Sequence, residues 1–196
     1  MTQSLRIAIA DDEPDMRDYF VKILPRLGHR VVVVASTGVE LVQQCLTARP
    51  DLVITDIKMP DMNGIDAAIR LYKEAAVPVI LVSAFHDPGL IERAETDHIM
   101  AYLVKPIKQG DLEPTIALAM RRFDQFQQLR REAKELRQSL DDRKTIERAK
   151  GILMKRASLD EPGAFRRLQK TASDKNLKLV EAAKMIVTAE EAFQGL

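Results

Sequence analysis

Four apolar runs in the first half of the sequence each stop at polar residues that could do chemistry, namely Asp11 and Asp12, Asp56, Ser83, and Lys105. The runs have the continuous apolar character of strands that are buried on both faces of a sheet. Because the carboxyl ends of parallel strands meet at one edge, we expect these five side chains to converge there. A role in stability alone would not place all of them on the same edge.

The types of these side chains predict phosphoryl chemistry. Clustered carboxylates without cysteines or paired histidines are hard oxygen ligands that suit Mg²⁺, so we predict a metal site at Asp11, Asp12 and Asp56. Asp56 can then attack phosphorus as a nucleophile and become an aspartyl phosphate. The Lys105 ammonium would neutralise phosphoryl oxygens, and the Ser83 hydroxyl would hydrogen-bond one of them afterwards. Taken alone, Asp56 and the MPDMNG that follows are also an ordinary strand end and turn.

The elements that must position these residues alternate along the chain. Strand-like runs cover 5–10, 31–34, 52–56, 77–82 and 100–104. Helical patterns separate them, the first beginning at Pro14 and the last a short one through Ile91. Short strand–helix units of this kind give a parallel sheet covered on both faces. The predicted fold class of this part is therefore α/β, with a doubly wound five-stranded parallel sheet.

Residues 5–119 resemble the receiver domain of two-component response regulators, on the strength of the residues just described. The resemblance implies the flavodoxin-like form of the doubly wound sheet and a sensor histidine kinase as partner. It also implies a cis peptide between Lys105 and Pro106. The turn at Asp97 and His98 departs from the small Gly-Ala pair that the family often carries, which puts the geometry of that loop in doubt.

The same resemblance assigns roles to single residues. Asp11 and Asp12 look like the metal-binding acidic pair, and Asp56 looks like the phosphoacceptor. Lys105 resembles the phosphate-binding lysine. Ser83 and Tyr102 resemble the switch hydroxyl and the switch aromatic residue of the family.

Charge is distributed unevenly over a chain whose net charge is only +1. Residues 143–184 hold 12 Lys and Arg against 5 Asp and Glu, a net charge of +7, so the remainder carries −6. The single cysteine, Cys45, excludes an internal disulfide and sits among apolar neighbours typical of a core. No stretch approaches the roughly 20 apolar residues of a membrane span, and we expect a cytoplasmic protein with no membrane partner.

A long helix is expected beyond the sheet, because residues 115–150 contain neither Gly nor Pro. Apolar residues follow a 3-4 spacing within it, at Phe126, Leu129, Ala133, Leu136 and Leu140. This spacing favours a two-stranded coiled coil and hence a homodimer. The alternative, that the seam packs on the receiver of its own chain, stays open.

The last fifty residues predict an all-α bundle of three short amphipathic helices. Ser158 and Glu161 have the spacing of a capping box at the start of the second helix, which carries Phe165 and Leu168 on its apolar face. The many basic residues of this segment are, from charge alone, most simply a solvated face.

Three strings in this segment resemble the ANTAR domain, an RNA-binding module of transcription antitermination regulators: 146–154, 164–172 and 176–186. The resemblance implies binding of paired hairpins in leader RNA by a dimer, which prevents a terminator from forming. Lys150, Gly151, Arg167 and Lys170 are the implied RNA contacts. Gly151 could instead be a point of close helix packing.

These observations predict a receiver domain over 1–120, a coiled-coil connector over 121–142 and an ANTAR domain over 143–196. The predicted function is a phosphorylation-controlled antiterminator. The alternatives are a DNA-binding output, such as a helix-turn-helix, and a module that binds an acidic protein. The connection over 158–163 argues for a simple bundle rather than a helix-turn-helix. We expect no enzymatic output, because residues 143–196 contain no histidine, cysteine or paired acids in a cleft-like pattern.

Overall fold

The computed structural model describes residues 4–83 and 99–194, and the chain divides into two compact units, 1–127 and 128–196. The expected short helix through Ile91 and the turn at Asp97 and His98 lie outside the described residues. No helix in the described part is both long and apolar enough to cross a membrane.

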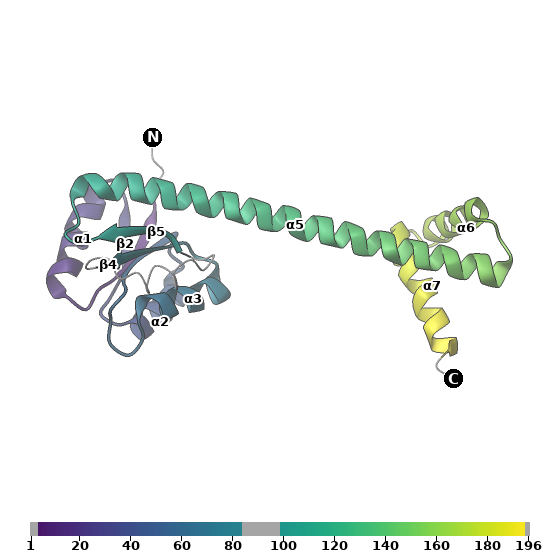
Figure 1. Ribbon diagram of the computed structural model, residues 1–196, viewed down its shortest axis with the longest axis horizontal. Coiled ribbons are helices and arrows are strands. Elements are labelled where there is room, and N and C mark those ends of the chain that lie inside the picture. The colour runs from purple at the N-terminus through teal and green to yellow at the C-terminus, as the bar shows by residue number, and fades with distance from the viewer. Residues whose placement is uncertain (1–3, 84–98, 195–196) are drawn as a thin grey trace. The chain divides into compact units, whose positions relative to one another are not determined.

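The N-terminal unit contains a five-stranded sheet in the order β2-β1-β3-β4-β5, with every neighbouring pair parallel (Figure 1). The strands are β1 (Arg6–Ala10), β2 (Arg30–Ala35), β3 (Leu52–Asp56), β4 (Val79–Ser83) and β5 (Ile99–Val104). The order reverses between β1 and β3, which makes this a doubly wound sheet. The fold class predicted from the sequence is confirmed.

Helices cover both faces of this sheet. Helices α2 (Gly38–Ala48) and α3 (Gly64–Ala75) pack on one face, while α1 (Pro14–Arg26) and the first part of α5 (Gln109–Ala157) pack on the other. Alternate residues of each strand point to opposite faces, so Ala8 packs toward α2 and its neighbour Ile9 toward α1. Strands buried on both faces need the continuous apolar runs seen in the sequence.

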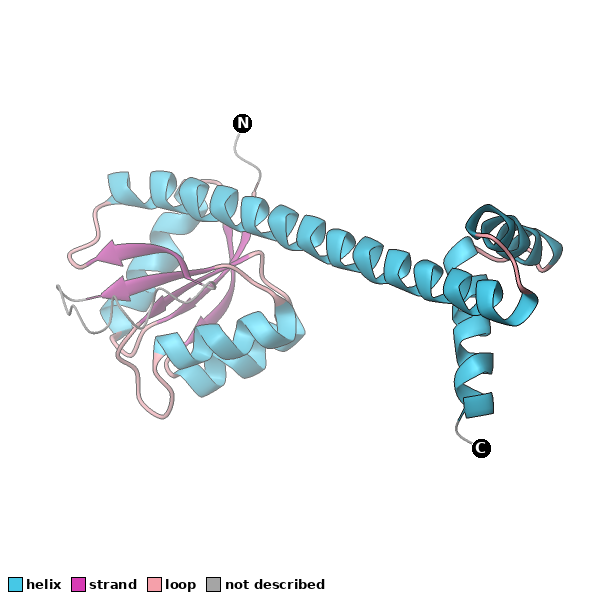
Figure 2. Ribbon diagram, turned by 45° about the vertical axis from the view of Figure 1, so that its right-hand side comes forward, coloured by secondary structure: helices cyan, strands magenta, loops and turns pink. Residues whose placement is uncertain are grey.

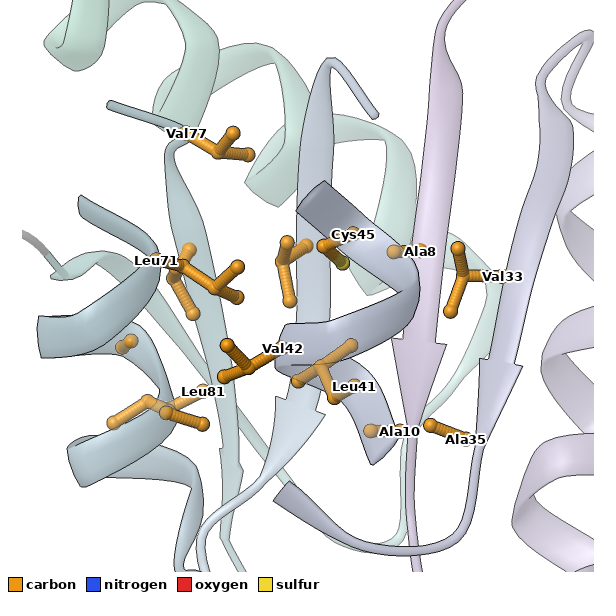
Figure 3. Packing of buried hydrophobic residues seen from close by; sticks show 14 of the residues in the cluster. Ala8, Ala10, Val33, Ala35, Leu41, Val42, Cys45, Leu71, Val77 and Leu81 are labelled. Carbon is orange, nitrogen blue, oxygen red and sulfur yellow. The ribbon is translucent and has the colours of Figure 1, made fainter. Parts of the chain in front are cut away.

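The packing under α2 shows how closely this helix approaches the sheet (Figure 3). Leu41 and Cys45 of α2 are fully buried over the strands, where β1 presents only the small side chains of Ala8 and Ala10. Burial raises the pKa of the Cys45 thiol to about 12, so the thiol stays protonated and unreactive at neutral pH. The prediction of Cys45 as a core residue is confirmed.

The C-terminal unit consists of the later part of α5 together with α6 (Glu161–Asp174) and α7 (Leu179–Gln194) (Figure 2). A small core joins them, made of buried Ala149, Leu168, Ala172, Ala182, Ala183 and Val187. Phe165, which the sequence placed on the apolar face, lies outside this core with 36% of its surface exposed. The predicted three-helix unit is confirmed, and the prediction for Phe165 is wrong.

The start of α6 differs from the predicted capping box. Ser158 has a left-handed backbone (φ 49°) and lies before the helix, whereas Asp160 is the N-cap and accepts a hydrogen bond from the Gly163 N–H at 2.9 Å. Because Asp160 satisfies this donor, Glu161 is free to reach Lys150 instead. The connection between α5 and α6 is thus only residues 158–160, shorter than the sequence suggested.

Candidate functional site

Asp56 is the last residue of β3, and only 5% of its surface is exposed. The hydrogen bonding between β3 and β4 extends one residue beyond Asp56, because the Ile57 N–H donates to the carbonyl of Val82 at 3.0 Å. The Lys58 N–H then turns back and donates to Asp56 Oδ2 at 2.7 Å. One carboxylate oxygen is therefore fixed by the backbone, while Oδ1 points to the other polar groups of the edge.

Lys105 contacts Asp11, Glu13 and Asp56, and Asp12 lies close to Asp11 and Glu13. We call these five residues the acidic edge. The ammonium Nζ lies 3.0 Å from Asp11 Oδ2, 3.1 Å from Asp56 Oδ1 and 3.0 Å from Glu13 Oε1. The Lys105 side chain is 14% exposed, and Asp11 is 1% exposed. The convergence of Asp11, Asp56 and Lys105 that the sequence predicted is what the structure shows.

The electrostatics of the acidic edge follow from burial and from this single cation. Burial raises the pKa of the Asp56 carboxyl, and its hydrogen bond to Lys105 opposes that rise. Burial alone would lower the pKa of Lys105, but hydrogen bonds to Glu13, Asp11 and Asp56 raise it overall. Lys105 is therefore positively charged at neutral pH and favours the ionised, nucleophilic form of Asp56.

The loop after β1 is held by its own hydrogen bonds. The Asp11 N–H donates to the carbonyl of Ala35 at 3.3 Å, and the Glu13 N–H donates to Asp11 Oδ1 at 2.9 Å. The Arg17 guanidinium donates to the carbonyls of Asp11 at 2.7 Å and Asp12 at 3.0 Å. Nothing in the sequence pattern singled out Arg17, because its role depends on the first turn of α1 folding back over this loop.

Two glycines set the position of the segment after Asp56. A Cβ at Gly64 would overlap the carbonyl oxygen of Asp56, and a Cβ at Gly38 would overlap the carbonyl oxygen of Met62. Because backbone atoms cannot move aside as a flexible side chain could, both positions require glycine. Asn63 caps α3 by accepting from the Asp66 N–H at 2.9 Å. The MPDMNG turn therefore returns tightly to the strand that carries Asp56.

The carboxylates that could share a metal ion are Asp11, Asp12 and Glu13, whose ligand oxygens lie within 4.8 Å of one another. Three carboxylates are hard ligands of the kind that Mg²⁺ prefers, so the residues fit this ion. Glu13 was not among the residues predicted from the sequence. Asp56 is not part of this group of three within the described residues, since Lys105 Nζ lies between it and Asp11.

The two predicted switch residues lie on neighbouring strands. Ser83 ends β4, and its carbonyl accepts a hydrogen bond from the Lys105 N–H at 2.8 Å, so the serine and the lysine are adjacent at the acidic edge. Tyr102 lies on β5 with 38% of its surface exposed. The Lys105–Pro106 peptide is cis, as the resemblance implied.

Lys150 is buried and ion-paired, whereas a side chain ready to contact RNA would be exposed to solvent. It is 8% exposed, and its Nζ lies 2.7 Å from Glu161 Oε1 and 3.1 Å from Glu147 Oε1. It also lies 6.0 Å from the centroid of the Phe165 ring. These contacts raise the pKa of Lys150, chiefly through Glu161. In this structure Lys150 braces α5 against α6.

Gly151 is not a point of close helix packing, because a Cβ at this position would meet nothing within 4 Å. That alternative interpretation of the sequence is wrong. Arg167 and Lys170 are exposed on α6, together with Arg166. Within the described part of the chain, none of these three cations is in an ion pair.

Other basic residues of the C-terminal unit are already paired. Arg156 forms a two-pronged contact with Glu190, at 3.0 and 3.1 Å, and Arg148 lies 2.7 Å from Glu191. Basic residues without an ion pair are thus available on α6, a feature that charge counting along the sequence could not reveal. The short connection over 158–160 has the length of a helix-turn-helix turn, so its length does not argue against a DNA-binding output.

Comparison with known proteins agrees with this geometry. The family description "Response regulator receiver domain" matches residues 7–117, and "ANTAR domain" matches residues 134–187. The "Transcriptional regulatory protein PdtaR" of Mycobacterium tuberculosis is 38% identical over 93% of this chain and 89% of its own length. The "Positive alginate biosynthesis regulatory protein" of Pseudomonas aeruginosa is 33% identical over 60% of this chain and 48% of its own length.

Solved structures resemble the N-terminal unit. The signal receiver domain of a modulated diguanylate cyclase from Desulfovibrio desulfuricans aligns with a TM-score of 0.59 and 25% identity, covering 62% of this chain and 98% of that one. The response regulator domain of Thermotoga maritima CheB aligns with a TM-score of 0.55 and 28% identity, covering 61% and 98%. With the acidic edge and the two family matches, these likenesses show that the chain belongs to the two-component response regulators, with a receiver domain followed by an ANTAR antitermination output domain.

Proposed function

We propose that this transcriptional regulator takes a phosphoryl group on Asp56 and then binds paired hairpins of leader RNA, so that a terminator does not form. The observation that carries the proposal is the acidic edge, where one ammonium reaches three carboxylates within 3.1 Å at the carboxyl ends of the strands. A cation fixed beside a nucleophilic carboxylate can stabilise the charge on a transferring phosphoryl group. The phosphoryl donor would be a sensor histidine kinase.

The transfer uses Asp56 as nucleophile and Lys105 as the fixed cation. Asp56 Oδ1, the oxygen that the Lys58 N–H does not bind, attacks phosphorus. A bond forms between this oxygen and phosphorus, and the bond to the donor breaks with its electron pair leaving on the donor. Lys105 Nζ, 3.1 Å from that oxygen, is placed to neutralise charge on the phosphoryl oxygens. Mg²⁺, held by Asp11 and Asp12 within the group of three carboxylates, would supply further charge neutralisation. Lys105 keeps its proton throughout this step.

A conformational switch in the receiver domain would follow from the negative charge that phosphorylation adds at Asp56. We assign Ser83 as the hydroxyl that hydrogen-bonds the phosphoryl group and Tyr102 as the aromatic residue that responds on the next strand. The adjacency of Ser83 and Lys105 across β4 and β5 supports this assignment. Because the two strands are paired, a shift at Ser83 is transmitted directly to β5.

Intact mass spectrometry after incubation with a small phosphodonor and Mg²⁺ tests the first half of the proposal. The wild-type chain should gain one phosphoryl group, and Asp56→Asn should gain none. Asp51→Asn is a matched control, because Asp51 is an exposed carboxylate at the opposite end of β3 that accepts from the Arg6 N–H. Labelling of Asp56→Asn at the wild-type rate, or labelling that a chelator does not slow, would contradict the assignment.

The RNA surface is proposed to lie on α6, where Arg167 and Lys170 are exposed and lie three residues apart on one helical face. Lys150 and Gly151 of α5 complete the predicted surface. Lys150 would have to exchange Glu161 or Glu147 for an RNA group, whereas Gly151 leaves open space that an RNA backbone could approach. Loop bases and 2′-hydroxyls are what such donors can read in structured RNA.

The second half of the proposal is RNA binding. It is tested by measuring how strongly the protein retains a two-hairpin RNA and a duplex DNA of equal charge at matched salt. Replacing Arg167 and Lys170 with alanine should weaken RNA binding, by roughly 1–3 kcal/mol for each base that these side chains hydrogen-bond. Arg148→Ala removes one charge from an ion pair elsewhere in the same unit and controls for the general electrostatic term. Equal retention of both nucleic acids would favour the DNA-binding alternative, and retention of neither would favour an acidic protein partner.

A further inference from the structure

The part of α5 that belongs to the C-terminal unit separates its charged side chains by sign. At about 100° per residue, four exposed cations fall within about 80° of one another on one side of the helix: Lys134, Arg137, Lys144 and Lys155. We call these four residues the basic row. At about 1.5 Å per residue, the basic row extends over about 32 Å of the helix.

The acids of the same stretch lie on the opposite side of α5. Glu132, Glu135 and Asp142 are turned by about 160° from the centre of the basic row. Two of these acids are held by glutamines, because Gln128 donates to Glu132 at 2.9 Å and Gln138 donates to Asp142 at 2.7 Å. The helix therefore pairs its acids with neutral side chains and leaves its cations on the other side.

The basic row has no anionic partner in the part of the chain that the structure describes, since none of its four members forms an ion pair there. Lys134 and Arg137 are three residues apart. Arg130 adds a like charge four residues before Lys134, and Arg148 adds one four residues after Lys144. Like charges at these spacings destabilise a helix, whereas opposite charges would stabilise it. The arrangement thus suits an external anion better than it suits the free helix.

Two other faces of α5 leave the basic row uncovered. The face that packs in the bundle core contains Ala149 and Leu153 and is turned by about 130° from the row. The exposed apolar side chains of Leu129, Leu136 and Leu140 lie about 90° from the row on its other side. A second helix on these leucines, as the predicted coiled coil requires, would leave the basic row open to solvent.

The chemistry of the basic row suits phosphate groups rather than bases. Residues 127–164 contain no aromatic residue, so this stretch lacks the flat surface on which unpaired bases stack. Exposed ammonium and guanidinium groups along a straight helix can neutralise phosphates and release their counterions. Gly151 lies beside the row, and a Cβ there would meet nothing within 4 Å, so a nucleic-acid backbone has room to approach.

We propose that the basic row binds the phosphate backbone of a double-stranded RNA stem, while Arg167 and Lys170 on α6 contact the loop. This inference rests on the proposed function for the identity of the ligand. It adds a second contact surface, which recognises the shape and charge of a stem. Phosphate contacts position a nucleic acid without reading its sequence, so the basic row supplies affinity and α6 supplies the preference for loops.

A loop-free RNA duplex of about 16 base pairs separates the two surfaces when it is titrated with the full-length chain at several salt concentrations. The wild type should bind this duplex with an affinity that falls as salt rises. The triple variant Lys134→Gln, Arg137→Gln and Lys144→Gln should bind it roughly tenfold more weakly or worse. The slope of log affinity against log salt should fall by about 2 to 3. Replacing Arg167 and Lys170 with alanine should leave most of the duplex binding in place.

Two matched pairs of variants separate the basic row from net charge. Arg137→Gln should weaken duplex binding by roughly threefold to fivefold. Arg131→Gln removes the same charge from the same helix about 110° away from the row, and should change binding by less than about twofold. Asp141 is the acid that lies within the row, so Asp141→Asn should strengthen binding. Glu135→Gln, on the opposite side, should not.

The outcomes distinguish this inference from the proposed function. A triple variant that binds the duplex as the wild type does, or equal losses in Arg131→Gln and Arg137→Gln, would overturn the basic row as a surface for RNA stems. A wild type that does not bind the duplex would overturn it too, and would favour an acidic protein as the partner of the row. If the row behaves as expected but the wild type shows no preference for two-hairpin RNA over duplex DNA, the proposed function is wrong and the row stands.

Discussion

The two units of this protein differ in how far their charged side chains are exposed to solvent. In the N-terminal unit, Asp11 and Asp56 are 1% and 5% exposed and share the Lys105 ammonium. In the C-terminal unit, Lys150 is buried, but both partners of the Arg148–Glu191 ion pair are more than half exposed. Charges withdrawn from water interact strongly and can stabilise a reacting group, whereas exposed charges remain available to a polyanion. Burial thus separates a site for chemistry from a surface for binding.

The hydrophobic cores of the two units differ as well. The sheet of the N-terminal unit is packed on both faces by large side chains, including Phe20, Leu41 and Leu81. The core of the C-terminal unit is mostly alanine, and Leu168 is its one large side chain among those that are less than 2% exposed in the described residues. Holding several charges out of water requires a rigid and extensive support, while a binding surface does not.

The largest expected effect is that of Gly64→Ala. Its Cβ would overlap the Asp56 carbonyl oxygen, so the turn or the strand end must shift, and we expect a loss of more than about 3 kcal/mol in the free energy of unfolding. Phosphorylation of Asp56 should be lost as well. Chemical denaturation and intact mass measure the two effects. Gly110→Ala is the control, since a Cβ there meets nothing within 4 Å; equal behaviour of the two variants would contradict the steric argument.

Leu168→Ala should come next, at about 2–4 kcal/mol, because it opens a cavity in a core that has few other large side chains. We expect the C-terminal unit to lose its protection against hydrogen exchange while the sheet keeps its own. Phosphorylation of Asp56 should persist. A variant in which both units lose protection together would show that the two cores unfold as one.

A smaller effect is expected from His29, which is 5% exposed and accepts a hydrogen bond from the Leu5 N–H at its Nδ1. Burial lowers its pKa, and Glu113 opposes this; Asp124 lines the same cavity. The unfolded chain therefore binds a proton near pH 6.5 before the folded chain does, and stability falls as the pH drops through that value. The slope should stay below about 1.4 kcal/mol per pH unit. His29→Gln should flatten the slope of the unfolding free energy between pH 7 and pH 5, and an identical slope in both proteins would refute the linkage.

The smallest effect is expected from Arg156→Gln. Its contact with Glu190 has good geometry, but the arginine side chain is 62% exposed, so water replaces much of the lost interaction. Its thermal midpoint should lie closer to that of the wild type than the midpoint of Leu168→Ala does. Lys105→Gln is the buried counterpart, because the same loss of charge in the acidic edge should abolish phosphorylation. Two variants with equal consequences would remove the distinction between buried and exposed charge.

Much of the fold followed from local patterns in the sequence. Continuous apolar runs such as 52–55 predicted strands buried on both faces, and the absence of Gly and Pro over 115–150 predicted the long helix. The convergence of Asp11, Asp56 and Lys105 followed from one rule about where parallel strands end. These features depend on residue type and spacing alone, so a single sequence determines them.

Tertiary structure decided which charges are buried, paired or left open. Lys150 and Arg167 look alike in the sequence, yet Lys150 is held by Glu161 eleven residues away while Arg167 is exposed. Glu13 and Arg17 gained their roles from the fold of the loop after β1, and Gly151 has no packing role because no neighbour lies close to it. A side chain's partners depend on which helices meet and at what rotation. Spacing along one element predicts a face but does not determine what lies opposite.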